Sequence, residues 1–298
     1  MLIESVLEAV GGTPLVRLKS MSSGNVFGKV EFLNPGGSVK DRVAKHIIEE
    51  AEKEGKLKSG MIIIEATSGN TGIGLSLVGV QKGYQVVCVM PENMSVERKK
   101  IIEAFGGEIV FTPASESLPG SLKKMEEITQ AEPQKYFIAN QFSNPCNPEI
   151  HYSQTGPEIW DDMNGEIDIF VAGVGSGGSL QGIGKFLKEK NPDVKIVAVE
   201  PKNSAALLGR EPGLHQIQGI GDGFIPDVLD LELVDMVFTV SDEEAIETTR
   251  KLSKEEGLLA GTSSGANVFV ALHMDNGRNK VVTILPDRVE RYFSTALI

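Results

Sequence analysis

The chain has 298 residues, of which 41% are hydrophobic and 23% charged, and its formal net charge is -12. This composition is typical of a globular protein of one or two domains with a large core. The acidic balance argues against nucleic acid or an anionic membrane surface as a partner. No apolar run approaches membrane-spanning length and no signal peptide is recognisable, so we expect a cytoplasmic protein.

Cysteine and histidine usage gives no sign of a metal site or of a disulfide framework. Cys88 lies in a strand-like run and Cys146 in a predicted loop, and neither has a C-x-x-C partner. We therefore expect no metal ligands. The histidines also lack metal-ligand spacing, and we interpret each as structural or exposed: His46, His151, His215 and His273.

The predicted elements begin with a short helix over residues 3–10 and strands over 15–18 and 26–33. A helix should run from Lys40 to about Lys53. Strands at 61–65, 85–90, 108–112 and 136–138 then alternate with helices at 71–82, 95–105 and 120–131. Short β-rich runs that alternate with longer helices indicate βαβ units and a parallel sheet.

A loop over residues 140–151 leads to a second series of the same kind. Its helices are predicted at 156–163, 180–190, 242–256 and 264–273, and its strands at 167–172, 195–200, 234–240 and 280–285. No repeat, low-complexity tract or flexible linker separates the two series. We therefore expect two α/β domains that share strands, with mostly parallel twisted sheets flanked by helices.

The stretch Asn34–Arg42 reads Asn-Pro-Gly-Gly-Ser-Val-Lys-Asp-Arg, a glycine-rich turn that leads into a helix. Ser38 is the predicted N-cap, and Lys40 lies in the first turn, off the apolar stripe. The helix dipole disfavours a cation there by about 0.3–1 kcal/mol and so lowers the pKa of the ammonium group. A neutral amine suits Schiff-base chemistry, although a solvated surface lysine is the simpler interpretation of this stretch alone.

Two more glycine-rich stretches, Thr67–Gly72 and Gly173–Ser179, each follow a predicted strand and open a helix. Backbone N–H groups, hydroxyls and the helix dipole converge at such junctions, so each is a predicted anion site. Two anion sites suit a ligand that carries a phosphate and a carboxylate. With Lys40 as the covalent link, this favours pyridoxal phosphate loaded with an amino acid.

The second stretch also matches a dinucleotide fingerprint, G-x-G-x-x-G, over residues 173–178. Glu200 is the only acidic candidate at the end of the following strand, so a nicotinamide-dependent oxidoreductase is less favoured.

A third turn, Gly261–Gly265, contains Ser263, whose hydroxyl could bond a pyridine nitrogen or could simply cap a helix. As a pyridine partner it would not keep the nitrogen protonated. That favours loss of a β-substituent after α-proton removal over transamination.

The combined motifs resemble those of the cysteine synthase and cystathionine β-synthase family, the fold-type-II pyridoxal-phosphate enzymes with a tryptophan synthase β-like fold. The match covers essentially the whole chain. Its motifs occur in order as Gly-Gly-Thr-Pro-Leu, Asn-Pro-Gly-Gly-Ser-Val-Lys-Asp-Arg, Thr-Ser-Gly-Asn-Thr-Gly, Asn-Gln-Phe-Ser-Asn-Pro, Gly-Ser-Gly-Gly-Ser, Ile-Gln-Gly-Ile-Gly, Gly-Thr-Ser-Ser-Gly-Ala and Glu-Arg-Tyr-Phe-Ser-Thr.

The resemblance implies a role for each matching residue. Lys40 is the expected Schiff-base lysine and acid/base, Asn70 the partner of the cofactor's 3′-oxygen, and Ser263 that of its ring nitrogen. The expected phosphate ligands are Gly175, Ser176, Gly177, Gly178 and Ser179. The substrate is expected to contact Thr67, Ser68, Gly69, Thr71, Gln141 and Gly219.

The resemblance also implies a homodimer and a smaller, mobile domain over residues 35–140, which holds the substrate carboxylate. Residues 1–34 and 141–298 would form the larger domain, which anchors the cofactor phosphate. Closure of the smaller domain would exclude water from a reactive aminoacrylate. Serine acetyltransferase is a partner that the family makes possible.

Three departures from the family pattern bear on specificity. Asp222 stands where cysteine synthases usually carry a small apolar residue; it could act as a general base on a nucleophile, or point to solvent or cap a turn. Pro286–Val289 replaces a serine-containing stretch and could reshape the surroundings of the ring nitrogen. Gln218 precedes Gly219 where phosphoserine-using relatives have an arginine, which disfavours phosphoserine, although Arg210 lies nearby.

The sequence therefore predicts a β-replacement enzyme of sulfur amino-acid metabolism, most simply one that makes cysteine from O-acetylserine and sulfide. An alternative reaction consumes cysteine, releases hydrogen sulfide and adds water or a thiol, giving serine, lanthionine or cystathionine, with Asp222 as general base. A catalytically silent amino-acid-binding relative is the non-enzymatic alternative.

Overall fold

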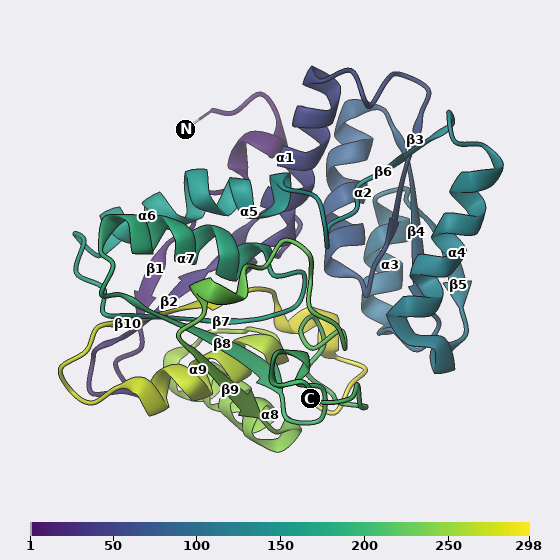
Figure 1. The fold of residues 1–298 in the computed structure, drawn as a ribbon. Coiled ribbons are helices and arrows are strands. Elements are labelled where there is room, and N and C mark those ends of the chain that lie inside the picture. Colours follow the sequence, from purple (N-terminus) through teal and green to yellow (C-terminus); the bar gives the residue numbers. More distant parts are fainter. Residues whose placement is uncertain (1) are drawn as a thin grey trace.

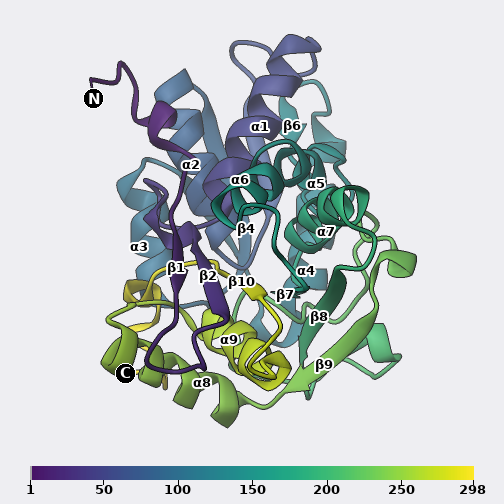
Figure 2. The same ribbon diagram turned by 90° about the vertical axis from the view of Figure 1, so that its left-hand side faces the viewer.

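The computed structural model describes residues 2–298, which form two sheets flanked by helices (Figures 1 and 2). The larger sheet has six strands in the order β1-β2-β10-β7-β8-β9, and only the β1–β2 pair is antiparallel. These strands are β1 (Leu15–Arg17), β2 (Val26–Val30), β7 (Ile169–Gly173), β8 (Lys195–Pro201), β9 (Met236–Val240) and β10 (Val281–Leu285).

The smaller sheet has four parallel strands in the order β5-β4-β3-β6. They are β3 (Ile62–Ala66), β4 (Gln85–Pro91), β5 (Glu108–Thr112) and β6 (Tyr136–Ile138). Both sheets are therefore mostly parallel, which confirms the predicted fold class.

The central strands are apolar without alternation because helices cover both faces of each sheet. Every residue of β10 is buried, and only Ile62 of β3 is partly exposed. The helices are α1 (Lys40–Lys53), α2 (Asn70–Lys82), α3 (Val96–Ala104), α4 (Ser117–Ala131), α5 (Cys146–Ile150), α6 (Gly156–Asp162), α7 (Gly178–Lys190), α8 (Asp242–Lys251) and α9 (Thr262–Met274).

The helices divide between the faces of the two sheets. In the smaller sheet, α1, α2 and α3 share one core cluster, whereas α4 packs on the opposite face (Figure 1). In the larger sheet, α8 and α9 share one cluster, and α6 and α7 contribute to another (Figure 2).

The predicted loop over residues 140–151 is the main error in the secondary structure. Residues 146–151 are helical instead, since α5 continues through a π-helical turn at His151–Thr155 into α6, the helix predicted at 156–163. Pro145 and Pro148 suggested a loop. Both lie at the start of α5, where a proline's missing N–H would have had no helical partner.

Smaller corrections concern element ends. The second strand stops at Val30, and Glu31–Leu33 form a 3-10 turn. The first helix is a 3-10 turn at Val6–Ala9, and α8 gives way to a π-helical turn at Leu252–Glu256. Ser38 is not the N-cap of α1, which is Val39, but its Oγ accepts the Lys40 N–H at 3.2 Å.

A buried ion-pair network links α1 to α6 and to the 3-10 turn after β2, which belongs to the larger sheet. The Arg42 guanidinium donates two hydrogen bonds to Glu31, at 2.8 and 2.9 Å, and two to Glu158 of α6, both at 2.7 Å. The Arg42 and Glu31 side chains are fully buried. Burial alone would raise the pKa of Glu158, but Arg42 and Lys29 hold it down to about 2.

The network predicts a loss of stability in acid. Because the pKa of Glu158 lies below its ordinary value of 4.5 in the folded state, its contribution is complete above that value and is lost as the pH falls towards 2. Glu158→Gln should lower the free energy of unfolding at neutral pH by about 1.5–3 kcal/mol and flatten its acid dependence. Urea titrations from neutral pH to about pH 3 would check this; parallel pH profiles for the two proteins would contradict it.

Candidate functional site

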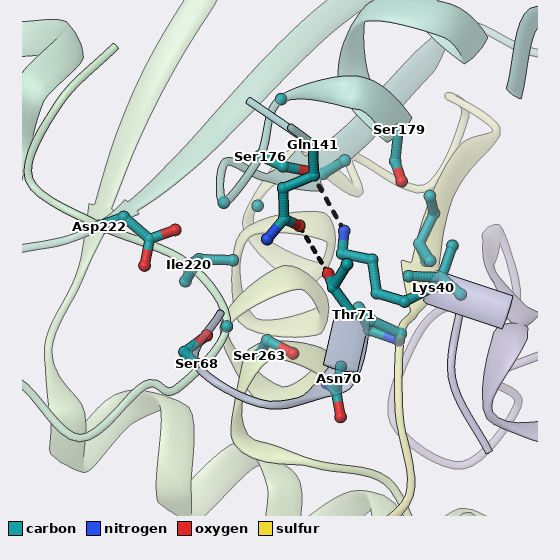
Figure 3. A pocket seen from close by; sticks show the side chains of 18 of the residues that line it. Lys40, Ser68, Asn70, Thr71, Gln141, Ser176, Ser179, Ile220, Asp222 and Ser263 are labelled. Carbon is teal, nitrogen blue, oxygen red and sulfur yellow. Dashed lines mark hydrogen bonds between the residues drawn. The ribbon is translucent and has the colours of Figure 1, made fainter. Parts of the chain in front are cut away.

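A pocket lies between the two sheets, where four helices begin. Lys40 opens α1, Asn70 opens α2, Ser179 is the second residue of α7, and Ser263 is the second residue of α9. Ligands of open α/β sheets bind beyond the carboxyl ends of the strands, and helix N-termini there favour anions. Figure 3 shows these side chains facing one space.

Most of the predicted site residues line this one pocket, although they come from six distant segments. Three do not: Thr67, Gly69 and Gly178 are buried directly behind its wall. Those that line it are Lys40, Ser68, Asn70, Thr71, Gln141, Gly175, Ser176, Gly177, Ser179, Gly219, Asp222 and Ser263.

Lys40 extends its ammonium group into the pocket, where Nζ donates to Ser176 Oγ at 3.3 Å (Figure 3). Burial lowers the pKa of Lys40 to about 8, against the opposing attraction of Asp222 and Asp287. A substantial fraction of this amine is therefore neutral slightly above neutral pH, as a nucleophilic or proton-accepting lysine requires.

The loop over residues 175–178, which leads into α7, forms a cradle, two of whose glycines lie too close to neighbouring residues to carry side chains. Gly177 has a φ of +79°, and a Cβ on Gly175 would stand 2.2 Å from the Gly219 carbonyl oxygen. A Cβ on Gly178 would stand 1.9 Å from Asn147 Oδ1. Glycine leaves the backbone N–H groups at the start of α7 open to an anion, so the cradle fits a phosphate group.

Two residues that the sequence did not single out as ligands support this cradle from behind. Asn147 Nδ2 donates to Ser176 Oγ at 3.0 Å and to the Gln141 carbonyl at 2.8 Å. His151 Nε2 lies 3.1 Å from Ser179 Oγ. Burial, reinforced by Lys40 and Arg42, moves the pKa of His151 well below its ordinary value, so the imidazole is neutral.

The loop before α2 faces the cradle from the smaller sheet. Thr67 Oγ1 accepts the Gly69 N–H at 3.0 Å, and Thr71 Oγ1 donates to Gln141 Oε1 at 2.6 Å. Glu65 positions Gln141, because its carboxyl accepts the backbone N–H groups of Asn140 and Gln141. Burial raises the pKa of Glu65 to about 7 despite these bonds.

Asn70 is fixed by residues from the end of the chain. Asp287 Oδ2 accepts bonds from Asn70 Nδ2 and from the Tyr292 hydroxyl, both at 2.7 Å, while Arg291 Nε donates to Asn70 Oδ1 at 2.8 Å. Arg98 of α3 approaches the same carboxylate oxygen to 3.6 Å. In the sequence, the stretch that contains Asp287 stands out only as a departure from the family pattern, and no motif points to Arg98.

Asp222 lies across the pocket from Lys40 and is partly exposed (Figure 3). Burial raises the pKa of its carboxyl, and His215 and Lys40 act in the opposite direction. A second cavity adjoins the pocket and shares Ser68, Gly219, Ile220 and Asp222 with it. Asp222 therefore stands at the junction of the two cavities.

Comparison with known proteins gives one family over most of the chain. The family model described as "Pyridoxal-phosphate dependent enzyme" matches residues 6–287. Cysteine synthase of Staphylococcus aureus is 49% identical over 302 residues, covering 99% of this chain and 97% of the relative.

Two solved structures extend the comparison to three dimensions. Cysteine synthase of Entamoeba histolytica has a TM-score of 0.94 and 42% identity, covering 100% of this chain and 91% of that one. A hydrogen sulfide-producing enzyme of Fusobacterium nucleatum has a TM-score of 0.94 and 43% identity, covering 98% of this chain and 100% of that one.

The close approach of Gly175 to Gly219 makes a testable prediction. Gly175→Ala must push two backbones apart, and we expect it to weaken retention of pyridoxal phosphate by about 1–3 kcal/mol, the usual cost of overpacking. Cofactor absorbance during titration of the cofactor-free protein measures this. Gly184→Ala, on α7 just after this loop, is the control, because its Cβ meets only side-chain methyl groups, at 3.1 Å or more. Equal retention by the two variants would contradict the prediction.

Proposed function

The chain belongs to the pyridoxal-phosphate-dependent enzymes, and from this premise we propose that it catalyses β-replacement, making cysteine from O-acetylserine and sulfide. The observation that carries the proposal is the set of side chains around Lys40. A partly neutral amine, a phosphate cradle and a second loop of hydroxyl and amide groups share one pocket.

The residues present fit the cofactor in its charged and polar parts. Lys40 would hold it covalently, the 175–179 loop would bind its phosphate, Asn70 its 3′-oxygen and Ser263 its ring nitrogen. When bound, pyridoxal phosphate supplies an electron-withdrawing ring that acidifies the α-proton of an attached amino acid.

The chain's own groups would then divide the work. Lys40 Nζ accepts the substrate's α-proton, which its lowered pKa suits. Ser68, Thr71 and Gln141, together with the buried Thr67 and Gly69 behind them, orient the substrate carboxylate. Gly219 contributes backbone to the same wall. Loss of the β-substituent leaves a carbon that sulfide can attack.

We extend the proposal to the assembly and motion of the molecule. Residues 35–140 would close over the substrate against residues 1–34 and 141–298 and exclude water. We also propose a homodimer, a cytoplasmic location and, as a family possibility, association with serine acetyltransferase. No helix within residues 2–298 combines the length and apolar character needed to cross a bilayer.

Product analysis of the purified enzyme tests the main reaction. O-acetylserine with sulfide should yield cysteine, and Lys40→Ala should abolish both turnover and the yellow colour of the protein. A yellow wild-type protein that produces no cysteine would contradict this reaction. If it also released no hydrogen sulfide from cysteine, a catalytically silent amino-acid-binding protein would be favoured.

The position of Asp222 favours a second candidate reaction. Its carboxylate faces Lys40 and borders the adjoining cavity, which is lined in part by Met94, Leu118 and Phe224 and has room for a nucleophile larger than sulfide. We propose that Asp222 is a general base for water or a protonated thiol. Cysteine would then serve as donor, with release of hydrogen sulfide and formation of serine, lanthionine or cystathionine. The Fusobacterium nucleatum relative, named for hydrogen sulfide production, supports this candidate.

Asp222→Ala separates the two reactions. General-base catalysis contributes roughly 10²–10⁴-fold, so sulfide release from cysteine should fall by about 10²-fold or more. Cysteine formation from O-acetylserine should change far less, because sulfide hardly needs a base. Asp227→Asn, an exposed acid on the same loop, is the control. Unchanged sulfide release from cysteine by Asp222→Ala would reject this role for the residue.

A further inference from the structure

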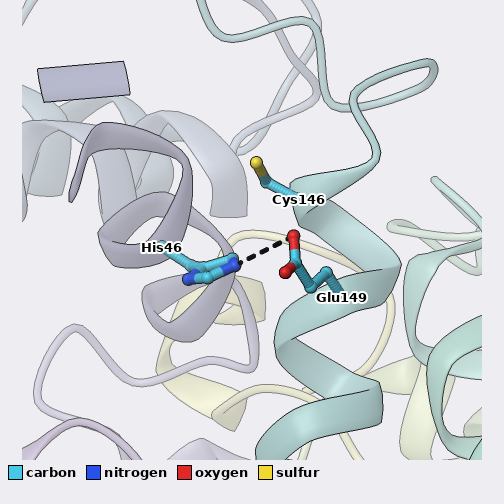
Figure 4. A group of neighbouring side chains, drawn as sticks. All are labelled: His46, Cys146 and Glu149. Atoms are coloured by element: carbon cyan, nitrogen blue, oxygen red, sulfur yellow. Dashed lines mark ion pairs between the residues drawn. The ribbon is translucent and has the colours of Figure 1, made fainter. Parts of the chain in front are cut away.

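A group of metal-binding side-chain types lies outside the pocket, where α1 packs against α5. His46 comes from α1, and Cys146 and Glu149 come from α5. One ligand atom from each residue, an imidazole nitrogen, the thiol sulfur and a carboxylate oxygen, lies within 4.8 Å of the other two. Figure 4 shows the His46 ring beside the Glu149 carboxylate, with the Cys146 thiol close to both.

The protein's own contacts leave this group incompletely satisfied. His46 Nε2 is 3.5 Å from Glu149 Oε2, which is too long for a good hydrogen bond. Within residues 2–298, this buried nitrogen has no hydrogen-bond partner. An unsatisfied buried polar atom destabilises the fold, and a cation bound beside Nε2 would remove that cost.

The ligand set indicates which cation would fit. Imidazole nitrogen, thiolate sulfur and carboxylate oxygen are the ligands of Zn²⁺, whereas Mg²⁺ and Ca²⁺ select oxygen. A thiolate and a carboxylate also balance the two positive charges, with neutral imidazole as the third ligand. Three protein ligands leave one position of a tetrahedral site for water or another small ligand.

The three ligand atoms need to move only slightly closer together to coordinate Zn²⁺. Zn²⁺ bonds of about 2.0–2.3 Å separate ligand atoms in a tetrahedral site by roughly 3.3–3.8 Å. The Glu149 side chain is 58% exposed and His46 is 17% exposed, so the carboxylate can move inward without disturbing the core.

We propose that His46, Cys146 and Glu149 bind a Zn²⁺-type divalent cation that links α1 to α5. The link would join two helices that serve the pocket, because α1 begins at Lys40 and α5 carries Asn147, which donates to Ser176 Oγ. The bound cation stabilises the fold through this bridge. This proposal revises the expectation of no metal ligands. The sequence did not suggest the site because α1 and α5 are far apart in the chain, so the three ligands have no recognisable spacing.

The test uses the tag-free, cofactor-loaded enzyme after chelation and removal of the chelator. Zn²⁺ alone is titrated by calorimetry, and Cd²⁺ is added separately to detect thiolate-to-metal absorption. We expect one equivalent of Zn²⁺, a rise in the melting temperature, and a Cd²⁺–thiolate band. His46→Gln and Cys146→Ser should each weaken Zn²⁺ binding by more than about 100-fold, since loss of an outer-shell partner alone costs 10–100-fold.

Two further variants keep the test decisive. Glu149→Gln alters a largely exposed side chain, so it should remain folded by circular dichroism while still weakening Zn²⁺ binding. His273→Gln, which alters an exposed histidine on α9, should bind Zn²⁺ like the wild type. The proposal is overturned if Zn²⁺ does not bind, if binding survives all three ligand substitutions, or if the Cd²⁺ band persists in Cys146→Ser.

Discussion

Four helix N-termini meet around the Lys40 side chain, and the chemistry of the pocket depends on this convergence. The starts of α1, α2, α7 and α9 all lie around one partly buried space, so their positive dipole ends converge there. Such a field attracts phosphate and carboxylate groups and disfavours an ammonium ion. Burial acts in the same direction on the lysine and lowers its pKa to about 8.

Buried polar groups fix the positions of these helix ends and of the loops beside them. Arg42 ties α1 to Glu31 and to α6, Asn147 holds the loop before α7, and Glu65 holds the backbone of Gln141. Each group lies in a region of low dielectric where an unpaired partner would be costly, so each fixes one arrangement of its neighbours. The ligand-binding atoms are thus supported by interactions that do not themselves face the ligand.

Specificity depends on what surrounds this shared machinery. Lys40 would accept the α-proton of any suitable amino acid, so the choice of donor and nucleophile falls to residues such as Asp222, where the pocket meets the adjoining cavity. The cation site proposed at His46, Cys146 and Glu149 would act differently. It would fasten the helix that carries Lys40 from behind and add stability without contacting the substrate.

The local parts of this protein were readable from the sequence because they depend on neighbouring residues. Apolar runs and glycine-rich turns predicted the strands and placed Lys40 and both glycine-rich loops at helix starts. Their roles in Schiff-base formation and anion binding stay predictions. The tertiary structure alone decided which side chains meet across long separations. Asp287 reaches Asn70, His151 supports Ser179, and Cys146 faces His46. It also decided that residues 146–155 are helical, because prolines are tolerated in a first helical turn and the segment packs on α7.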